Sequence, residues 1–347
     1  MTFDERYMRR ALQLAALGAG HVSPNPMVGA VIVGPDGDII GEGWHRQWGQ
    51  GHAEVNAVAS VRRPELLEES TMYVTLEPCS HWGKTPPCAR LIIERGIPRV
   101  VVGATDPFPA VSGRGIAMLR EAGVEVVSGV LAEESRRLNA RFITAHTQHR
   151  PFVLLKWAQS ADGYMDRRRE PGQGAARLSS PLTSLLMHRL RSMMDGILVG
   201  SGTALADDPH LDARLWPGGR SPRPVLLDRR QRVPASARLM QRDPIVVNAD
   251  MPMADMLHML YEEYGLTSLM VEGGSRVLAS FMNSGLWDAA RVEVAPEIFG
   301  AEGTAPAPAP GREPMACRMV DSRNIFYYSN NPLVEKSSLL TYGEEER

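Results

Sequence analysis

The first half of the chain alternates short apolar runs with stretches whose apolar positions recur at helical spacing. The apolar runs predict strands at residues 30–33, 39–44, 72–76, 99–104 and 124–128, and the helical spacing predicts helices at 8–17, 53–61, 88–95 and 115–122. A Pro-Asp-Gly-Asp turn at 35–38 joins the first two strands as a hairpin. This alternation predicts a layered α/β sheet that is partly parallel.

The second half shows a similar alternation. Strands are predicted at 152–158, 196–199, 225–227, 245–247 and 269–272, and helices at 181–192 and 277–282. Gly273 and Gly274 follow the last of these strands and precede a helix, where small residues let a phosphate reach free amide groups. This is not the Gly-x-Gly-x-x-Gly dinucleotide fingerprint, so the pattern does not indicate an ordinary Rossmann domain.

A polar link separates the two halves. Residues 138–142 end a helix, and the polar residues 146–150, followed by Pro151, are interpreted as a short connection. We therefore expect a boundary near residue 147, with one domain at 1–146 and a second at 150–347. Neither half repeats the other, so the chain is interpreted as a fusion of two unlike domains.

Composition is that of a globular protein and argues against several partners. The chain has 347 residues, 44% of them apolar and 22% charged, with a formal net charge of −2. So weak a charge gives no electrostatic case for nucleic acid. No run approaches the roughly 18 apolar residues of a membrane span, and the charged N-terminal helix does not have the character of a signal peptide. With three cysteines in all, two of them in the metal-binding motif described below, we expect a reducing, cytoplasmic setting and no disulfides.

Two short motifs in the first half carry the chemistry. His52-Ala53-Glu54 is followed, after a helix-length gap, by Pro78-Cys79 and then Cys88. One imidazole and two thiolates make three zinc ligands and leave the fourth position open, as catalytic zinc sites do. Such a zinc activates a water near neutral pH, and Glu54 can carry protons between that water and a leaving amine. The zinc deaminases of nucleobases share this wiring.

Two alternatives remain open from the residues. A structural zinc site could be closed by His45, His81 or Cys317, or Cys79 and Cys88 could be plain buried thiols. Neither alternative needs Glu54, which favours a catalytic site. Eight residues separate the two cysteines, not two as in the commonest deaminase pattern, and this insert carries His81 and Lys84. Their positive charge indicates an anionic, phosphorylated substrate.

Other polar residues of the first half have two possible interpretations. Asn25 lies between two prolines and could bind the amide edge of a pyrimidine, although an ordinary loop asparagine fits equally well. His45 could reach a substrate from Gly41-x-Gly43-x-His45, or could be a surface histidine. Arg114, at a predicted helix start, is a plausible phosphate ligand, and Asp106 ends a strand facing the same region.

Several motifs of the first half together resemble one known family. Ser-Pro-Asn-Pro-x-Val-Gly at 23–29, His-Ala-Glu at 52–54 and Glu-Pro-Cys-x-His-x-Gly-Lys-Thr-Pro-Pro-Cys at 77–88 resemble the bifunctional deaminase–reductase family of riboflavin biosynthesis. The resemblance implies a cytidine-deaminase-like three-layer domain that deaminates a diaminopyrimidinone carrying ribosylamino 5′-phosphate. It implies zinc ligands His52, Cys79 and Cys88, the proton shuttle Glu54, and substrate positions Asn25, His45, His81 and Lys84. Phe108 stands where the family commonly has Asn.

The second half resembles the reductase part of the same family. Lys-x-Ala-x-Ser-x-Asp-Gly at 156–163, Gly-x-Gly-Thr at 200–203, Ala-Asp-Asp-Pro at 206–209 and Val-Glu-Gly-Gly at 271–274 carry this likeness. It implies a fold similar to dihydrofolate reductase, the cofactor NADPH and a homodimer. Cofactor positions are Ala158, Thr203, Asp207, Gly274, Ser275, Arg276, Val277, Leu278, Ala279 and Ser280. Substrate positions are Arg191, Leu211, Arg214 and Glu272, with the two arginines expected to hold the phosphate as forks. The implied reaction is hydride delivery to the ribose carbon, which opens the ring to a ribityl chain.

The second half also departs from the family pattern. Arg177 stands where Trp is frequent, Arg229 stands where a Ser often touches the cofactor, and 304–310 is rich in proline. An alternative function is therefore an active deaminase with a non-catalytic C-terminal binding or dimerisation domain. A deaminase of tRNA or another nucleotide would need a basic surface or a cysteine pair two residues apart, and the sequence shows neither.

Overall fold

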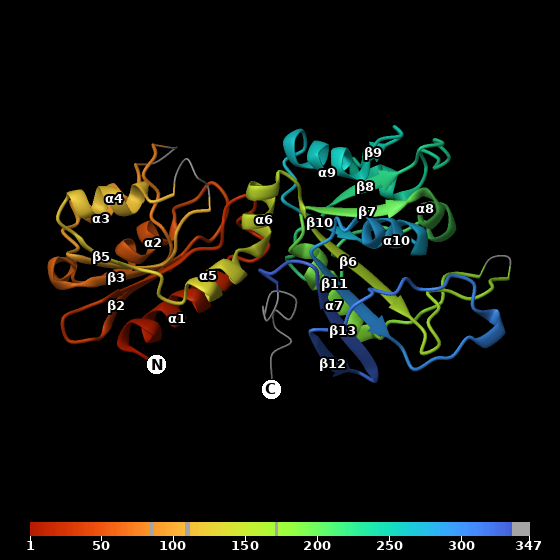
Figure 1. Ribbon diagram of the computed structural model, residues 1–347, viewed down its shortest axis with the longest axis horizontal. Coiled ribbons are helices and arrows are strands. Elements are labelled where there is room, and N and C mark those ends of the chain that lie inside the picture. The colour runs from red at the N-terminus through yellow and green to blue at the C-terminus, as the bar shows by residue number, and fades with distance from the viewer. Residues whose placement is uncertain (83–85, 108–111, 171–172, 335–347) are drawn as a thin grey trace. The chain divides into compact units, whose positions relative to one another are not determined.

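The chain divides into two compact units, Met1–Thr147 and Gln148–Arg347. The computed structural model describes residues 1–82, 86–107, 112–170 and 173–334, and each unit is built around its own sheet (Figure 1). The predicted polar link at 146–150 is wrong in part, because helix α6 (Ala140–Gln148) continues through its first three residues. In this last turn the hydroxyl of Thr147 donates a hydrogen bond to the carbonyl oxygen of Ile143. The helix ends before His149, whose φ is 50°.

The sheet of the first unit combines a hairpin with parallel strands. Its strands are β1 (Gly29–Val33), β2 (Ile39–Trp44), β3 (Thr71–Leu76), β4 (Arg99–Ala104) and β5 (Glu125–Ser128), in the order β2-β1-β3-β4-β5. β1 is antiparallel to both β2 and β3, whereas β3, β4 and β5 are parallel to one another. The predicted partly parallel sheet is therefore confirmed, with strand bounds within one residue of those expected.

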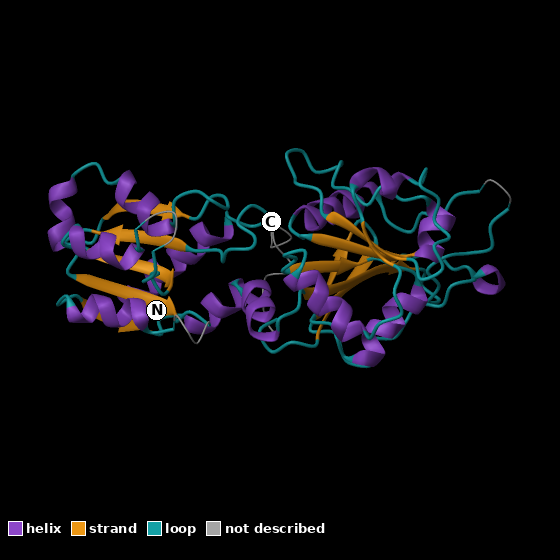
Figure 2. Ribbon diagram, turned by 90° about the horizontal axis from the view of Figure 1, so that it is seen from above, coloured by secondary structure: helices purple, strands orange, loops and turns teal. Residues whose placement is uncertain are grey.

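Helices cover both faces of this sheet. They are α1 (Phe3–Ala16), α2 (Ala53–Ser60), α3 (Cys88–Glu94), α4 (Arg114–Glu121), α5 (Ala132–Leu138) and α6, with a 3-10 turn η1 (Pro64–Glu69). One apolar core joins α1 to one face of the sheet, and a second joins α2, α3 and α4 to the other. Figure 2 shows helices on both sides of the strands. This is the expected three-layer arrangement.

The second unit is built on a larger, mostly parallel sheet. Its strands are β6 (Phe152–Gln159), β7 (Gly196–Gly200), β8 (Arg223–Leu227), β9 (Ile245–Val247), β10 (Ser268–Val271), β11 (Ala289–Val294), β12 (Ala316–Val320) and β13 (Arg323–Ser329). The order is β12-β13-β11-β6-β10-β7-β8-β9. Among these described strands, β13 alone runs opposite to the others, since it is antiparallel to both β11 and β12 and the remaining pairs are parallel. The final hairpin, β12 and β13, lies in a region for which the sequence offered no motif.

The helices of the second unit serve two purposes: α9 and α10 pack on a buried core, and α7 borders a cavity. They are α7 (Pro181–Ser192), α8 (Ser201–Asp207), α9 (Met253–Glu262) and α10 (Ser275–Ser284), with 3-10 turns η2 (Arg238–Arg242) and η3 (Gly300–Glu302). Side chains alternate along β6: Val153, Leu155 and Trp157 belong to the core with α9 and α10. Lys156 and Ala158 instead line a cavity with residues of α7, and Trp157 also borders this cavity. The sheet thus uses one face for stability and presents charged groups on the other.

Residues 302–307 extend this unit beyond the main sheet. They pair with 163–168 through isolated antiparallel bridges, Tyr164 with Pro306 and Arg167 with Gly303. A Cβ at Gly303 would lie 2.4 Å from the Tyr164 ring, so this crossing requires glycine. None of the described helices is both long enough and apolar enough to cross a membrane.

Candidate active sites

Three side chains from three elements of the first unit meet at one point. His52 is the N-cap of α2, Cys79 follows β3, and Cys88 is the first residue of α3 after Pro87. Nδ1 of His52 lies 3.7 Å from Sγ of Cys79 and 3.4 Å from Sγ of Cys88. All three potential ligand atoms lie within 4.8 Å of one another. The two sequence motifs are therefore brought together as expected.

This group fits a catalytic zinc ion by the chemistry of its donors. One imidazole nitrogen and two sulfurs are the ligands that zinc prefers, and three of them leave a coordination position for water. Within the described part of the chain, the group contains only His52, Cys79 and Cys88. His45 lies nearby, but its ring nitrogens bond to Asn25 and to Gly51. The geometry therefore favours an open site over a closed structural one.

Local interactions give the two thiols different pKa values and raise the pKa of Glu54. A hydrogen bond from Cys88, together with His52, lowers the pKa of Cys79 to about 4, although burial opposes this shift. The same contact with Cys79 and burial raise the pKa of Cys88. Glu54 is buried in the first turn of α2, and its burial and the charge of Cys79 raise its pKa to about 7. A carboxyl with this pKa can both accept and donate a proton near neutral pH.

A cavity of 450 Å3 opens beside the three ligands. Its walls contain the predicted residues Asn25, His45, His52, Glu54, Cys79, His81 and Asp106. The lining also contains residues that were not predicted, among them Trp48, Phe142 and His146. Phe142 and His146 lie one turn apart on α6, with ring centroids 4.5 Å apart, and this helical spacing was the only signal for them. Lys84 lies outside the described residues, as does Phe108.

Asn25 and His45 act as a connected pair in the cavity wall. The carbonyl oxygen of Gly51 can only accept, so Nδ1 of His45, 3.1 Å away, carries the hydrogen. Nε2 of His45, when neutral, must then accept from the side-chain amide of Asn25 at 3.2 Å. Burial lowers the pKa of His45, which favours the neutral ring. The interpretation of His45 as a surface histidine is therefore wrong, since the residue is buried.

Glu77, which precedes the Pro-Cys pair, has a role that the sequence did not reveal. Its carboxylate accepts hydrogen bonds from the backbone N–H groups of Asp106, Gly113, Gly115 and Ile116, at 2.9 to 3.3 Å. These include the free amides at the start of α4, where the sequence had suggested a phosphate site.

The suggested phosphate site at Arg114 is therefore wrong, because a protein carboxylate already occupies those amides. A Cβ at Gly115 would lie 1.9 Å from the carbonyl oxygen of Pro78, so α4 also abuts the loop that carries Cys79. Together, Glu77 and this close approach fix the loop of one zinc ligand against α4.

The second unit has its own cavity, of 550 Å3, on the α7 face of the sheet. Its lining residues include Lys156, Ala158, Arg177, Ser180, Ser184, His188, Arg214, Leu215 and Glu272. Three cationic side chains line this cavity, against one carboxylate, so the cavity favours an anion. Burial and the neighbouring arginines lower the pKa of His188 to about 4, which keeps its imidazole neutral.

The predicted phosphate fork at Arg191 is not what the structure shows. Nε and Nη2 of Arg191 donate to the two carboxylate oxygens of Glu272, at 2.8 and 2.7 Å. The remaining Nη1 donates to the carbonyl oxygen of Asp212 at 3.0 Å. Arg214 is more exposed and pairs only with the Asp212 carboxylate among its described contacts. Leu211 is buried and is not among the described residues that line the cavity.

The predicted cofactor positions are partly gathered at the ends of β7 and β10. A Cβ at Gly274 would lie 3.1 Å from Oγ1 of Thr203, and one at Gly273 would lie 3.3 Å from the amide nitrogen of Gly200. The starts of α8 and α10 are thus side by side. At one of these positions, Leu278, the side chain is buried in the core between α10 and the sheet.

The charged residues near this edge already have protein partners. Asp207 forms an ion pair with Arg169 at 2.7 Å, and Arg229 forms one with Asp250 at 3.0 Å. Arg177, the other departure from the family pattern, lies in the cavity wall.

Comparison with known proteins agrees with both halves of this arrangement. The family model of the RibD C-terminal domain matches residues 151–326, and that of the cytidine and deoxycytidylate deaminase zinc-binding region matches residues 1–104. The riboflavin biosynthesis protein RibD of Aquifex aeolicus is 39% identical over 86% of this chain and 88% of its own length. The chain belongs to the RibD family. The RibD of Escherichia coli is 33% identical over 90% of this chain and 93% of its own.

Solved structures of RibD proteins share the whole fold. RibD of Acinetobacter baumannii superposes with a TM-score of 0.86 at 29% identity, over 94% of this chain and 98% of its own. A deaminase/reductase of Thermotoga maritima, 36% identical, gives a TM-score of 0.84 with the same coverage. As a RibD, this protein is a bifunctional deaminase and reductase of riboflavin biosynthesis, with a zinc-binding deaminase domain and a reductase domain that uses a nucleotide cofactor.

Proposed function

We propose that the first unit deaminates 2,5-diamino-6-ribosylamino-4(3H)-pyrimidinone 5′-phosphate with zinc and that the second reduces the ribosyl side chain to ribityl with NADPH. The observation that carries the proposal is the His52, Cys79 and Cys88 group beside the buried Glu54 in one cavity. Domains at 1–146 and 150–347 would carry the two reactions.

In the deamination, Glu54 would move the protons. Zinc held by His52, Cys79 and Cys88 supplies Lewis acidity that makes a water nucleophilic near neutral pH. Glu54 would take the two protons of the attacking water in turn and pass one to the ring nitrogen beside the reacting carbon and the other to the departing amino group, so that ammonia leaves and a carbonyl remains. Asn25, positioned by His45, would accept a hydrogen bond from the pyrimidine edge with its carbonyl oxygen. His81 and Lys84 would attract the phosphate.

In the reduction, the cationic cavity would hold the phosphorylated pyrimidine. Arg214 uses one guanidinium nitrogen on Asp212, so its other N–H groups would bind the substrate phosphate. Arg191 would act by orienting Glu272. NADPH bound here would supply a hydride to the first ribose carbon, the bond from that carbon to the ring oxygen would break, and the oxygen would gain a proton. Burial lowers the pKa of Lys156 in the cavity wall, which makes its ammonium a better proton donor.

The cofactor would lie where β7 and β10 end. Ala158, Thr203 and Asp207 would contact it, with the amides at Gly274, Ser275 and Arg276 at the start of α10. Val277, Ala279 and Ser280 would follow along the helix, and Leu278 would support them from the core. The family also leads us to propose a homodimer, which sedimentation would test, and a cytoplasmic location, which cell fractionation would test.

One paired assay tests the proposal. Zinc-loaded protein receives the diaminopyrimidinone phosphate and NADPH, and ammonia release and NADPH oxidation are followed together. Both signals are expected. Ammonia without NADPH oxidation would favour the alternative of an active deaminase joined to a non-catalytic domain, and would make Arg177→Trp and Arg229→Ser the first reversions to try. Absence of ammonia would overturn the deaminase proposal.

A further inference from the structure

The connection between α8 and β8 has no regular secondary structure, and it brings residues proposed to contact substrate to the cavity. It spans residues 208–222 and carries Arg214 and Leu215, both of which line the cavity. Two non-glycine residues in it have left-handed backbones, Asp208 with φ 39° and Leu211 with φ 54°. Side chains rarely adopt this conformation, so the surrounding structure must hold this turn in place.

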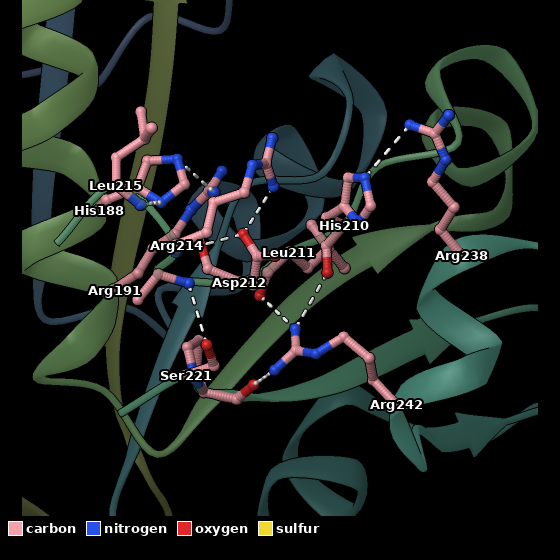
Figure 3. Close-up of polar contacts among 12 residues, drawn as sticks. His188, Arg191, His210, Leu211, Asp212, Arg214, Leu215, Ser221, Arg238 and Arg242 are labelled. Atoms are coloured by element: carbon pink, nitrogen blue, oxygen red, sulfur yellow. Dashed lines mark hydrogen bonds and ion pairs between the residues drawn. The ribbon is translucent and has the colours of Figure 1, made fainter. Parts of the chain in front are cut away.

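Two arginines donate hydrogen bonds to three consecutive carbonyl oxygens of this turn. Nη1 of Arg242 donates to the carbonyl oxygens of His210 and Leu211, at 3.0 and 2.7 Å. The next carbonyl, that of Asp212, accepts from Nη1 of Arg191 at 3.0 Å. Figure 3 shows Arg191 and Arg242 approaching the turn from opposite sides. The left-handed residue at Leu211 lies between them, so the two side chains hold the turn from both directions.

Arg242 also connects the turn to the start of the sheet. Its Nη2 donates to the carbonyl oxygen of Pro222, at 2.9 Å, and Pro222 directly precedes β8. Within the described residues, the hydrogen bonds of this guanidinium go to main-chain oxygens, so they fix backbone rather than side chains. A planar fork can serve three carbonyls at once, whereas a lysine offers one nitrogen.

The 3-10 turn that carries Arg242 is itself fixed to the sheet. Arg242 ends η2, whose Leu239 is fully buried. The following Asp243 accepts hydrogen bonds from the Arg223 side chain on β8, through its carbonyl and its carboxylate. The guanidinium therefore starts from a fixed point on the sheet, which allows it to determine where the turn lies.

Past Leu211, the chain leads directly into the cavity wall. The amide of Ala213 donates to Oγ of Ser221 at 3.0 Å, and that of Leu215 donates to Nδ1 of His188 at 3.3 Å. A shift of the His210–Leu211 turn would thus move Arg214 and Leu215 relative to His188. We propose that Arg242 is a positioning residue for the reduction: it holds this turn so that Arg214 faces the phosphorylated substrate. This inference rests on the proposed reductase function of the second unit.

The test compares Arg242→Ala and Arg242→Lys with Arg238→Ala. Arg238 lies on the same 3-10 turn, and its side chain contacts the ring of His210 and the carboxylate of Asp208 instead of the turn's carbonyls. Binding of the deaminated, phosphorylated substrate is measured by calorimetry, and KM and kcat for its reduction are measured with saturating NADPH. Ammonia release, which belongs to the other unit, controls for the amount of active protein, and urea unfolding reports on the folding of the second unit.

We expect Arg242→Ala to raise both KM and the dissociation constant about tenfold or more, because the charged donors that hold the turn are lost. Arg242→Lys should recover only part of this loss, and Arg238→Ala should stay within about twofold of the parent, as surface substitutions usually do. A lower kcat at unchanged KM, or equal effects at Arg238 and Arg242, would overturn the positioning role. If the parent binds the substrate without oxidising NADPH, the reductase proposal fails and the binding data still decide the role of Arg242. No binding by the parent overturns both.

Discussion

Nε and Nη2 of Arg191 donate parallel hydrogen bonds to the two carboxylate oxygens of Glu272, at 2.8 and 2.7 Å. Both residues lie at positions expected to contact substrate, yet each uses most of its bonding capacity on the other. Burial opposes ionisation of Glu272, but the charge and hydrogen bonds of Arg191 outweigh it and lower the pKa of Glu272 to about 2. The pair is thus a fixed part of the cavity wall, and Arg214 is the arginine that we propose to bind the phosphate.

This pair predicts a pH dependence of the second unit's stability. The folded pKa of Glu272 lies below its ordinary value of 4.5, so its contribution is complete above pH 4.5 and is lost as the pH falls towards 2. The shift corresponds to about 3 kcal/mol. Urea unfolding of the parent and of Glu272→Gln should differ by 3–5 kcal/mol near pH 6, because the substitution leaves Arg191 without its counter-charge, and by much less at pH 3. A difference independent of pH would contradict this account.

Replacing Glu54 by Gln should stop deamination without removing the metal. The amide keeps the size of the carboxyl but cannot transfer the proton, so ammonia release should fall about a thousandfold. Zinc content, measured by atomic absorption, should stay at the parent level, and NADPH oxidation with the deaminated substrate should not change. Retention of the full rate would exclude a proton-transfer role for Glu54.

Removing zinc should separate the two activities. A chelator should abolish ammonia release, whereas reduction of the deaminated substrate continues, because the described metal-binding group lies wholly in the first unit. Far-ultraviolet circular dichroism should change little, because two apolar cores already hold the first unit together. Unfolding on chelation would instead indicate a structural metal.

The substitution Arg214→Ala should weaken recognition of the phosphate in the reductase cavity. Loss of a charged hydrogen bond is worth about 1.5–3 kcal/mol, so KM for the phosphorylated substrate should rise by about tenfold or more. A dephosphorylated substrate provides the control, since its KM should be nearly equal for the parent and the variant. Equal increases for both substrates would show that Arg214 acts on something other than the phosphate.

The parts of the fold that sequence patterns predicted are those determined locally. The apolar runs gave the strands, and His52, Glu54 and Cys79 are recognisable because each stands in a short motif. Helix α8 was not predicted, because two glycines stand at its start, Gly200 as the N-cap and Gly202 in the first turn. The cavities depend on residues far apart in sequence, such as Lys156, His188 and Glu272, whose meeting only the sheet order determines.

Hydrogen-bond partners were the least predictable feature. Arg191 and Glu77 are both polar residues near functional motifs, and the sequence gives no indication that protein groups already occupy them. In each case the partner lies on another element: Glu272 after β10, and the amides at the start of α4. Pairings of this kind follow from the packing of the elements, and spacing along the chain does not reveal them.

The separate anchoring of Cys79 and Cys88 has an evolutionary consequence. Cys79 is held by β3, by the contacts of its loop with α4 and by hydrogen bonds from the amides of Cys88 and Ala89, and Cys88 is held by the start of α3. The length and composition of the segment between them can therefore change by insertion or deletion without moving either sulfur. Lineages of such deaminases could acquire new substrate preferences by exchanging this one insert while inheriting the metal centre intact.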